Sequence, residues 1–337
     1  MKNAVFAGLV ISAALTASAF AATPAYKIVD RIKVPDGGFD YATFDPATGR
    51  VYMPRGAYTT IIDVKTGKPS QLMSGASDHI ALVVPGTTLV VLTQRAGKIR
   101  IADTATDKVV AEFQGEKNPN SAAYDAVTKQ VFVLNKESGT ATVLDPFHFK
   151  VVGTIPISPN TLEFPVADGA GRIFDNIETT AEIAVIDTKT RKVTTRYKLA
   201  GCEEPTGLAY VSDAKLLISS CGNGVAKFTN ADTGKDVASV PIGRGPDAVI
   251  YDATRKLAFI PCGRDGVLEV ISLADLGHIA LVQHVQTQQG SRTGTLDPAT
   301  GRVYLMASKP DPAAVPPPGG RGAPRLAGSW EVLVVGP

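Results

Sequence analysis

Hydrogen-bonding and charged side chains recur at one position of an internal repeat, five residues before a repeated aspartate. The repeated aspartates are Asp45, Asp125, Asp168, Asp252 and Asp297. Across the repeats this position holds Asp40, Asn120, Glu163, Thr206, Asp247 and Arg292, and also His79 when the second strands are aligned. Carboxylates and amides accept hydrogen bonds or bind hard cations, whereas a guanidinium binds a carboxylate or phosphate through two hydrogen bonds. The pattern therefore predicts ligand recognition, provided that the fold brings these residues together.

The repeat also predicts that fold. A second series of aspartates, Asp63, Asp103, Asp145 and Asp187, advances in steps of 40, 42 and 42 residues. Each unit reads as four short strands rich in β-branched and aromatic residues, separated by turn sequences such as TGK and DPATG. A period of about forty residues with four strands per unit is typical of a β-propeller. We therefore expect an all-β, seven-bladed β-propeller with four antiparallel strands per blade.

The ring should be closed by the N-terminal strand. The last unit supplies only three strands of its own, at Arg292–Leu296, Arg302–Ala307 and Trp330–Val335. We expect Tyr26–Val34 to pair beside the third of these, which leaves no open sheet edge and makes residues 23–337 one domain. Within the last unit, Lys309–Gly328 carries six prolines and four glycines and is predicted to be a loop. A lid over the channel and a passive loop both remain open for it.

In a propeller, the connections after each second strand face the same end as the start of each innermost strand. These connections contribute Arg55, Gln94, Arg95, Asn135, Asn176, Asn223 and Arg264. Polar groups that converge on a concave site predict a binding face at this channel mouth, although a water-filled polar channel is the alternative. The candidate ligand-binding residues are Asp40, Arg55, His79, Asn120, Asn135, Glu163, Asn176, Asp247, Arg264 and Arg292. Arg292 is the strongest single candidate, because its planar fork suits an anionic group.

A metal-assisted hydrolase or lactonase is the enzyme alternative. Its oxygen ligands for Ca²⁺ or Mg²⁺ would be Asp40, Asn120, Glu163 and Asp247. Arg292 on the same ring would repel a cation, so we expect no cofactor and favour a protein that is not an enzyme. No HExxH, CxxC or GxSxG motif is present, and the sequence identifies no catalytic residue.

The first residues indicate export. Lys2 precedes the apolar stretch Ala4–Leu15, and Ala19-Phe20-Ala21 forms a small-x-small cleavage site. We expect residues 1–22 to be a cleaved signal peptide and the mature protein to be soluble, periplasmic and monomeric, with no membrane insertion. The formal net charge of +2 does not favour nucleic acid as a partner.

The three cysteines, Cys202, Cys221 and Cys262, suit that compartment. Cys202 precedes the innermost strand of the fifth unit and Cys221 ends the next strand, so both lie at the mouth end of one blade. We expect them to form a disulfide. Cys262 ends the matching strand one blade further on and is left as a small buried thiol or a thiol that reaches the mouth, whereas a three-thiolate metal site is a minor alternative.

The chain resembles the YVTN-repeat, YncE-like periplasmic β-propellers, a group with WD40-like repeats. The resemblance is carried by turns such as VIDTKTRK and ADTGKDVASVPIG, and by the pattern GCEEPTGLAY…SSCGNG…PIGRGPDAVIYD. It covers essentially the whole mature chain and implies a binding or cell-envelope protein with no common catalytic motif. We therefore expect a small molecule, peptide or protein partner at the mouth. An accessory or redox-partner subunit of an envelope complex remains the other alternative.

Overall fold

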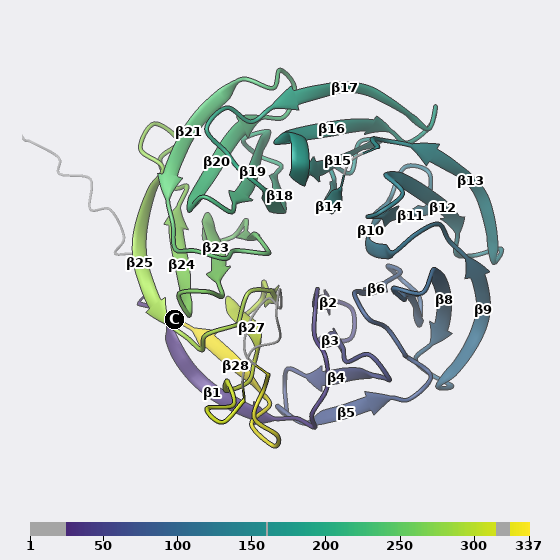
Figure 1. The fold of residues 1–337 in the computed structure, drawn as a ribbon, viewed down its shortest axis with the longest axis horizontal. Helices are drawn as coiled ribbons and strands as arrows, with labels where there is room; N and C mark the ends of the chain where they lie inside the picture. The colour runs from purple at the N-terminus through teal and green to yellow at the C-terminus, as the bar shows by residue number, and fades with distance from the viewer. Residues whose placement is uncertain (1–24, 160, 315–323) are drawn as a thin grey trace, which may run out of the picture.

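The structure, a computed structural model, describes residues 25–159, 161–314 and 324–337. The described strands form seven four-stranded antiparallel sheets, which radiate from a central channel as the blades of a propeller (Figure 1). The predicted seven-bladed fold is therefore confirmed. The predicted signal peptide lies outside the described residues, as do residues 315–323 of the predicted loop. Among the residues described, no helix is long and apolar enough to cross a membrane.

Each blade runs from an innermost strand at the channel to an outermost strand at the rim. The first two blades comprise β2 (Thr43–Asp45), β3 (Arg50–Pro54), β4 (Thr59–Asp63), β5 (Pro69–Leu72), β6 (Ala81–Val83), β7 (Leu89–Thr93), β8 (Lys98–Asp103) and β9 (Lys108–Gln114). The third and fourth comprise β10 (Pro119–Asp125), β11 (Gln130–Asn135), β12 (Thr140–Asp145), β13 (Lys150–Pro156), β14 (Leu162–Ala167), β15 (Arg172–Ile177), the 3₁₀ turn η1 (Glu178–Thr180), β16 (Glu182–Asp187) and β17 (Lys192–Lys198). The fifth and sixth comprise β18 (Pro205–Val211), β19 (Leu216–Cys221), β20 (Val225–Asn230), β21 (Asp236–Pro241), β22 (Ile250–Asp252), β23 (Leu257–Cys262), β24 (Val267–Ser272) and β25 (Ala280–Gln286).

The seventh blade joins the two ends of the chain. It comprises β26 (Gly294–Asp297), β27 (Arg302–Ala307), β28 (Glu331–Gly336) and β1 (Lys27–Lys33). β1 pairs antiparallel with β28, from Lys27 opposite Gly336 to Lys33 opposite Glu331. The purple and yellow strands therefore lie side by side (Figure 1). This confirms the predicted closure by the N-terminal strand, which covers the outer edge of β28.

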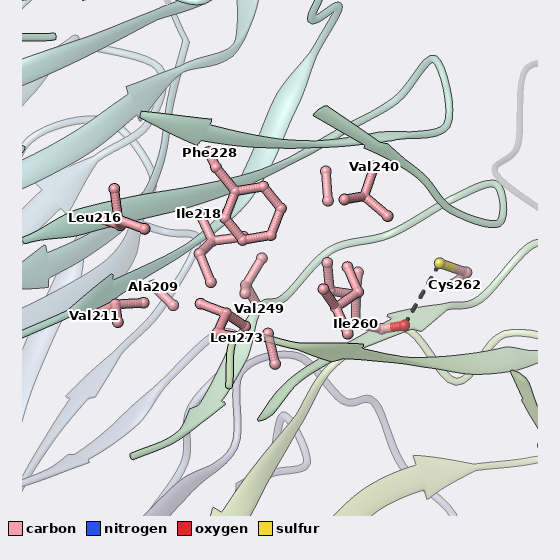
Figure 2. Packing of buried hydrophobic residues seen from close by; sticks show 13 residues of the cluster. Ala209, Val211, Leu216, Ile218, Phe228, Val240, Val249, Ile260, Cys262 and Leu273 are labelled. Atoms are coloured by element: carbon pink, nitrogen blue, oxygen red, sulfur yellow. Dashed lines mark hydrogen bonds between the residues drawn. The ribbon is translucent and has the colours of Figure 1, made fainter. Parts of the chain in front are cut away.

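Apolar side chains hold neighbouring blades together. Phe228 and Ile218 of the fifth blade pack with Val249, Ile260 and Leu273 of the sixth in one buried cluster (Figure 2). Full burial of such side chains stabilises the fold by about 1.5–3 kcal/mol each. The core is therefore distributed between the blades, and each sheet depends on both neighbours.

The repeated aspartates serve the turns rather than the channel. One carboxylate oxygen of Asp45 accepts the N–H of Ala47 at 3.0 Å, and the other accepts the Thr48 hydroxyl at 2.6 Å. Asp297 caps the corresponding turn of the last blade in the same way. These Asx turns start the hairpins at the end of the ring opposite the mouth. The aspartate that makes the repeat visible in the sequence is thus a structural residue.

Candidate functional site

The mouth residues come from short loops and from strand starts at one end of the ring. Asn120 and Glu163 lie within β10 and β14, as predicted. In other blades the innermost strand begins later than expected, so Asp40, Asp247 and Arg292 lie in the segments that lead into β2, β22 and β26. Along most of their length these segments do not pair with a neighbouring strand. Their side chains can therefore turn toward one another across the channel.

The first cluster surrounds His79, whose side chain is only 2% exposed. Its Nδ1 lies 2.7 Å from Asp40 Oδ2 and 3.1 Å from the amide nitrogen of Asn120. Its Nε2 lies 2.9 Å from Asn118 Oδ1, an acceptor, so Nε2 carries a proton in this arrangement. Nδ1 lies between an acceptor, Asp40, and a donor, Asn120. Side chains from the first and third blades therefore hold the imidazole in place.

The second cluster is a buried ion pair. The Lys136 ammonium contacts the Glu163 carboxylate and also lies 3.5 Å from Glu178 Oε2. The Tyr41 hydroxyl donates to Glu163 Oε2 at 3.3 Å. Burial raises the pKa of Glu163 well above its usual range, Lys136 opposes this shift, and the carboxylates of Glu178 and Asp247 add to it. The cluster thus holds the Glu163 carboxyl group in the interior, where its negative charge depends on the nearby ammonium group of Lys136.

Asp175 lies behind this ion pair. It is fully buried in β15, and neither of its oxygens makes a hydrogen bond of normal geometry with any described residue. Burial raises the pKa of Asp175 well above its usual range, whereas the backbone of Glu163 and the charge of Lys136 oppose the shift. The environment therefore favours the neutral acid at this position.

The third cluster fixes an arginine at the opening. Arg292 Nε donates to Asp247 Oδ2 at 2.7 Å, and the guanidinium lies 4.6 Å from the centre of the Phe39 ring. The Arg292 side chain is nevertheless 37% exposed. Burial raises the pKa of Asp247, the charge of Arg292 opposes this shift, and Asp40 adds to it. Arg292 is thus both immobilised and open to solvent.

Tyr41 connects the three clusters. Burial raises its pKa well above the usual range, and the charges of Asp247, Glu163 and Asp40 raise it further. These carboxylates must therefore all lie near one phenol. The structure brings six of the predicted residues together at the mouth: Asp40, His79, Asn120, Glu163, Asp247 and Arg292.

The other predicted residues are used differently. Arg55 is 2% exposed, stacks 4.5 Å from the Trp330 ring centre and donates to the Pro35 carbonyl at 2.6 Å. It packs the first blade against the seventh. The Arg264 side chain is exposed near Gly245, whose added Cβ would lie 2.8 Å from Arg264 Cβ.

The two asparagines at second-strand ends are fully buried. The Asn135 amide donates to Thr140 and Thr142 hydroxyls of its own blade, each at 3.0 Å. The Asn176 amide donates to the carbonyl oxygens of Thr206 and Gly207, each at 3.1 Å, and so ties the fourth blade to the fifth. In both asparagines the donor group is engaged by the protein.

Several mouth residues were not among the sequence candidates. Each lies beside one that was: Tyr41 follows Asp40, Asn118 lies two residues before Asn120, and Lys136 follows Asn135. The repeat alignment selected a single position per blade. Reading the flanking positions for polar and ionisable side chains would have found these three.

The acidic residues of the metal alternative already have side-chain partners. Glu163 contacts Lys136, Asp247 binds Arg292 and Asp40 contacts His79. Over the described ranges, no group of three or more His, Cys, Asp or Glu side chains is arranged to hold a metal ion.

The predicted disulfide between Cys202 and Cys221 is present, with Cα atoms 5.4 Å apart. It links the segment before β18 to the end of β19. Cys262 is a free, fully buried thiol (Figure 2). Burial, with a contribution from the Glu269 carboxylate, raises the pKa of Cys262, which disfavours the reactive thiolate form.

The solved structures that this chain resembles are β-propellers. A chain of the mitotic checkpoint complex superposes with a TM-score of 0.77 at 11% identity and covers 100% of this chain and 99% of that one. U3-55K gives 0.77 at 8% identity, with 92% and 98% covered, and the RRP9 WD40 repeats give 0.75 at 9% identity, with 91% and 97% covered. No protein-family model and no curated protein sequence matches this chain. At these identities the likeness shows the WD40-type propeller fold alone.

Proposed function

We propose that this chain is an exported binding protein that takes a partner protein, or a peptide segment of one, at the channel mouth. The observation that carries the proposal is the convergence of ionisable groups from six blades on one opening, with His79 and Glu163 almost completely buried. Burying charged groups costs free energy even when they are paired, so a fold gains nothing in stability from gathering them there. One structural neighbour belongs to a multi-protein complex, the mitotic checkpoint complex, which agrees with a protein as the partner.

The export part of the proposal rests on residues 1–22 and on the cysteines. A disulfide such as Cys202–Cys221 persists in an oxidising compartment and is rare in a reducing one. With the repeat turns, this also supports a place among the YncE-like periplasmic propellers. N-terminal sequencing of the protein from fractionated cells should find Ala22 or Thr23 first, in the soluble envelope fraction. A full-length chain in the cytoplasm would contradict export.

Site-specific photocrosslinking tests the binding face. A photoreactive residue replaces Arg95, whose backbone N–H donates to Asp78 beside His79 at the mouth, or His278, which lies on the opposite face. We expect a discrete adduct with an envelope protein from position 95 and none from position 278.

Two variants refine the result. Arg292→Ala should weaken capture at position 95, because a hydrogen bond to a charged group contributes about 1.5–3 kcal/mol. His148→Ala, on the opposite face, should leave capture unchanged. An adduct from position 278 alone, or sensitivity to His148→Ala and not to Arg292→Ala, would show that we have chosen the wrong face.

A further inference from the structure

We propose that Arg292 and Arg325 together form a carboxylate-binding subsite at the mouth, so that the bound partner presents a carboxylate there. The inference rests on the proposed function, in which the mouth is the binding face. Arg325 lies in the second described part of the Pro/Gly-rich segment, residues 324–328, and was not a candidate from the repeat alignment. Only the folded structure places Arg325 near Arg292.

Arg292 offers one half of the subsite. Its Nε is bound by Asp247 and its guanidinium plane rests near Phe39, at the distances given above. Among the residues that the structure describes, none accepts a hydrogen bond from its two terminal nitrogens. These nitrogens form the fork that binds a carboxylate with two parallel hydrogen bonds. Because the side chain is already ordered, little rotamer entropy is lost when an anion binds.

Arg325 offers the other half. Its Nη1 donates to the carbonyl oxygens of Gln289 at 3.2 Å and Ser308 at 3.4 Å. Its guanidinium covers Gly290, where an added Cβ would lie 2.1 Å from Nη2. None of the ion pairs found in the described part of the chain includes Arg325. Carbonyl oxygens position this guanidinium but leave its charge uncompensated.

Two glycines, Gly263 and Gly290, lie between the two arginines. A Cβ added at Gly263 would lie 2.7 Å from Arg292 Cβ and 3.3 Å from the carbonyl carbon of Gly290. Gly263 therefore packs closely against both the Arg292 backbone and Gly290, the residue beneath Arg325. Burial lowers the pKa of Arg325, and the positive charge of Arg292 lowers it further, which agrees with two like charges near each other.

The charges around the subsite favour a monoanion. Arg292 is directly paired with Asp247, whereas Arg325 has no ion pair among the described residues. A carboxylate would bring the one negative charge that Arg325 lacks. A dianionic phosphate would bring an excess negative charge next to Asp247 and Asp40, whose charges both act on Arg292. The subsite therefore suits an acidic side chain or a chain terminus of the partner.

The test uses the whole mature protein and acetate as the probe. The arginine Nε–Hε resonances are followed by NMR during titration with sodium acetate, at ionic strength held constant with chloride. We expect Arg292 and Arg325 to shift together with one dissociation constant. Arg325→Gln should raise that constant about tenfold, equivalent to 1.4 kcal/mol. Arg244→Gln is the matched control, since Arg244 is an exposed arginine at the same end of the ring and already pairs with Asp265 at 2.7 Å.

The possible results distinguish failure of the subsite from failure of the proposed function. Absence of a common shift, or an unchanged constant in Arg325→Gln, would overturn the subsite. Tighter binding of inorganic phosphate than of acetate at pH 8 would overturn its assignment to carboxylates. The titration needs no partner. Acetate binding without photocrosslinks would leave the subsite standing and remove the proposed function, whereas photocrosslinks at position 95 without acetate binding would remove only the subsite.

Discussion

Replacing Lys136 by methionine tests whether the buried Glu163 depends on a single counter-ion. The side chain of Glu163 is 3% exposed and that of Lys136 is 19% exposed. Removing one partner of a buried ion pair costs about 3–5 kcal/mol, because the other charge stays buried without compensation. Since water reaches the Lys136 side of this pair, we take the lower limit. Lys136→Met should therefore reduce the free energy of unfolding by about 3 kcal/mol at pH 7.

The loss should depend on pH in a defined direction. Burial already raises the pKa of Glu163 above its ordinary value of 4.5, and removing the opposing charge of Lys136 raises it further. A carboxyl group with a raised pKa holds its proton more tightly in the folded state. Stability therefore falls as the pH rises from the unfolded pKa to the folded pKa. The defect of Lys136→Met should be small at pH 4 and larger at pH 7.

Urea unfolding followed by tryptophan fluorescence measures this effect, because Trp330 is the single tryptophan and is buried. Lys136→Met/Glu163→Gln should recover most of the lost stability at pH 7, since it removes the stranded charge. Lys98→Met is the matched control: its ion pair with Glu112 is exposed on both sides, so the midpoint should not move. If Lys136→Met unfolds at the wild-type urea concentration at pH 7, or loses the same stability at pH 4, the reasoning is wrong.

Three further predictions concern the fold. Gly207→Ala should destabilise by about 1–3 kcal/mol or more in urea unfolding, because its Cβ would lie 2.4 Å from the Ala248 carbonyl carbon of the next blade. Gly38→Ala, with no neighbour closer than 3.9 Å, should be nearly neutral. Replacing Cys202 and Cys221 together by alanine should cost about 3 kcal/mol in the same assay, and an unchanged midpoint would argue against the disulfide. Deleting residues 26–34 should expose β28 and cause aggregation in size-exclusion chromatography, and a monomeric product would refute closure by β1.

The blade number and the closure of the ring followed from the sequence alone. Each repeat of about forty residues corresponds to one four-stranded sheet, so the number of repeats gives the number of blades. The last unit lacked one strand, and only the N-terminal segment could supply it. Cys202 and Cys221 were predictable as a pair for the same reason, because both positions lie at the mouth end of one blade.

The repeat could also place polar residues at the mouth, since equivalent positions in a ring share one end. It could not decide which of them remain available to a ligand. Arg55 and Arg292 were both candidates, yet Arg55 is buried against Trp330 and Arg292 stays partly exposed above Phe39. Lys136 and Arg325 were not candidates at all. Pairing across blades depends on distances between segments far apart in the chain, and side-chain burial depends on packing from both neighbouring blades. Only the tertiary structure determines those two quantities.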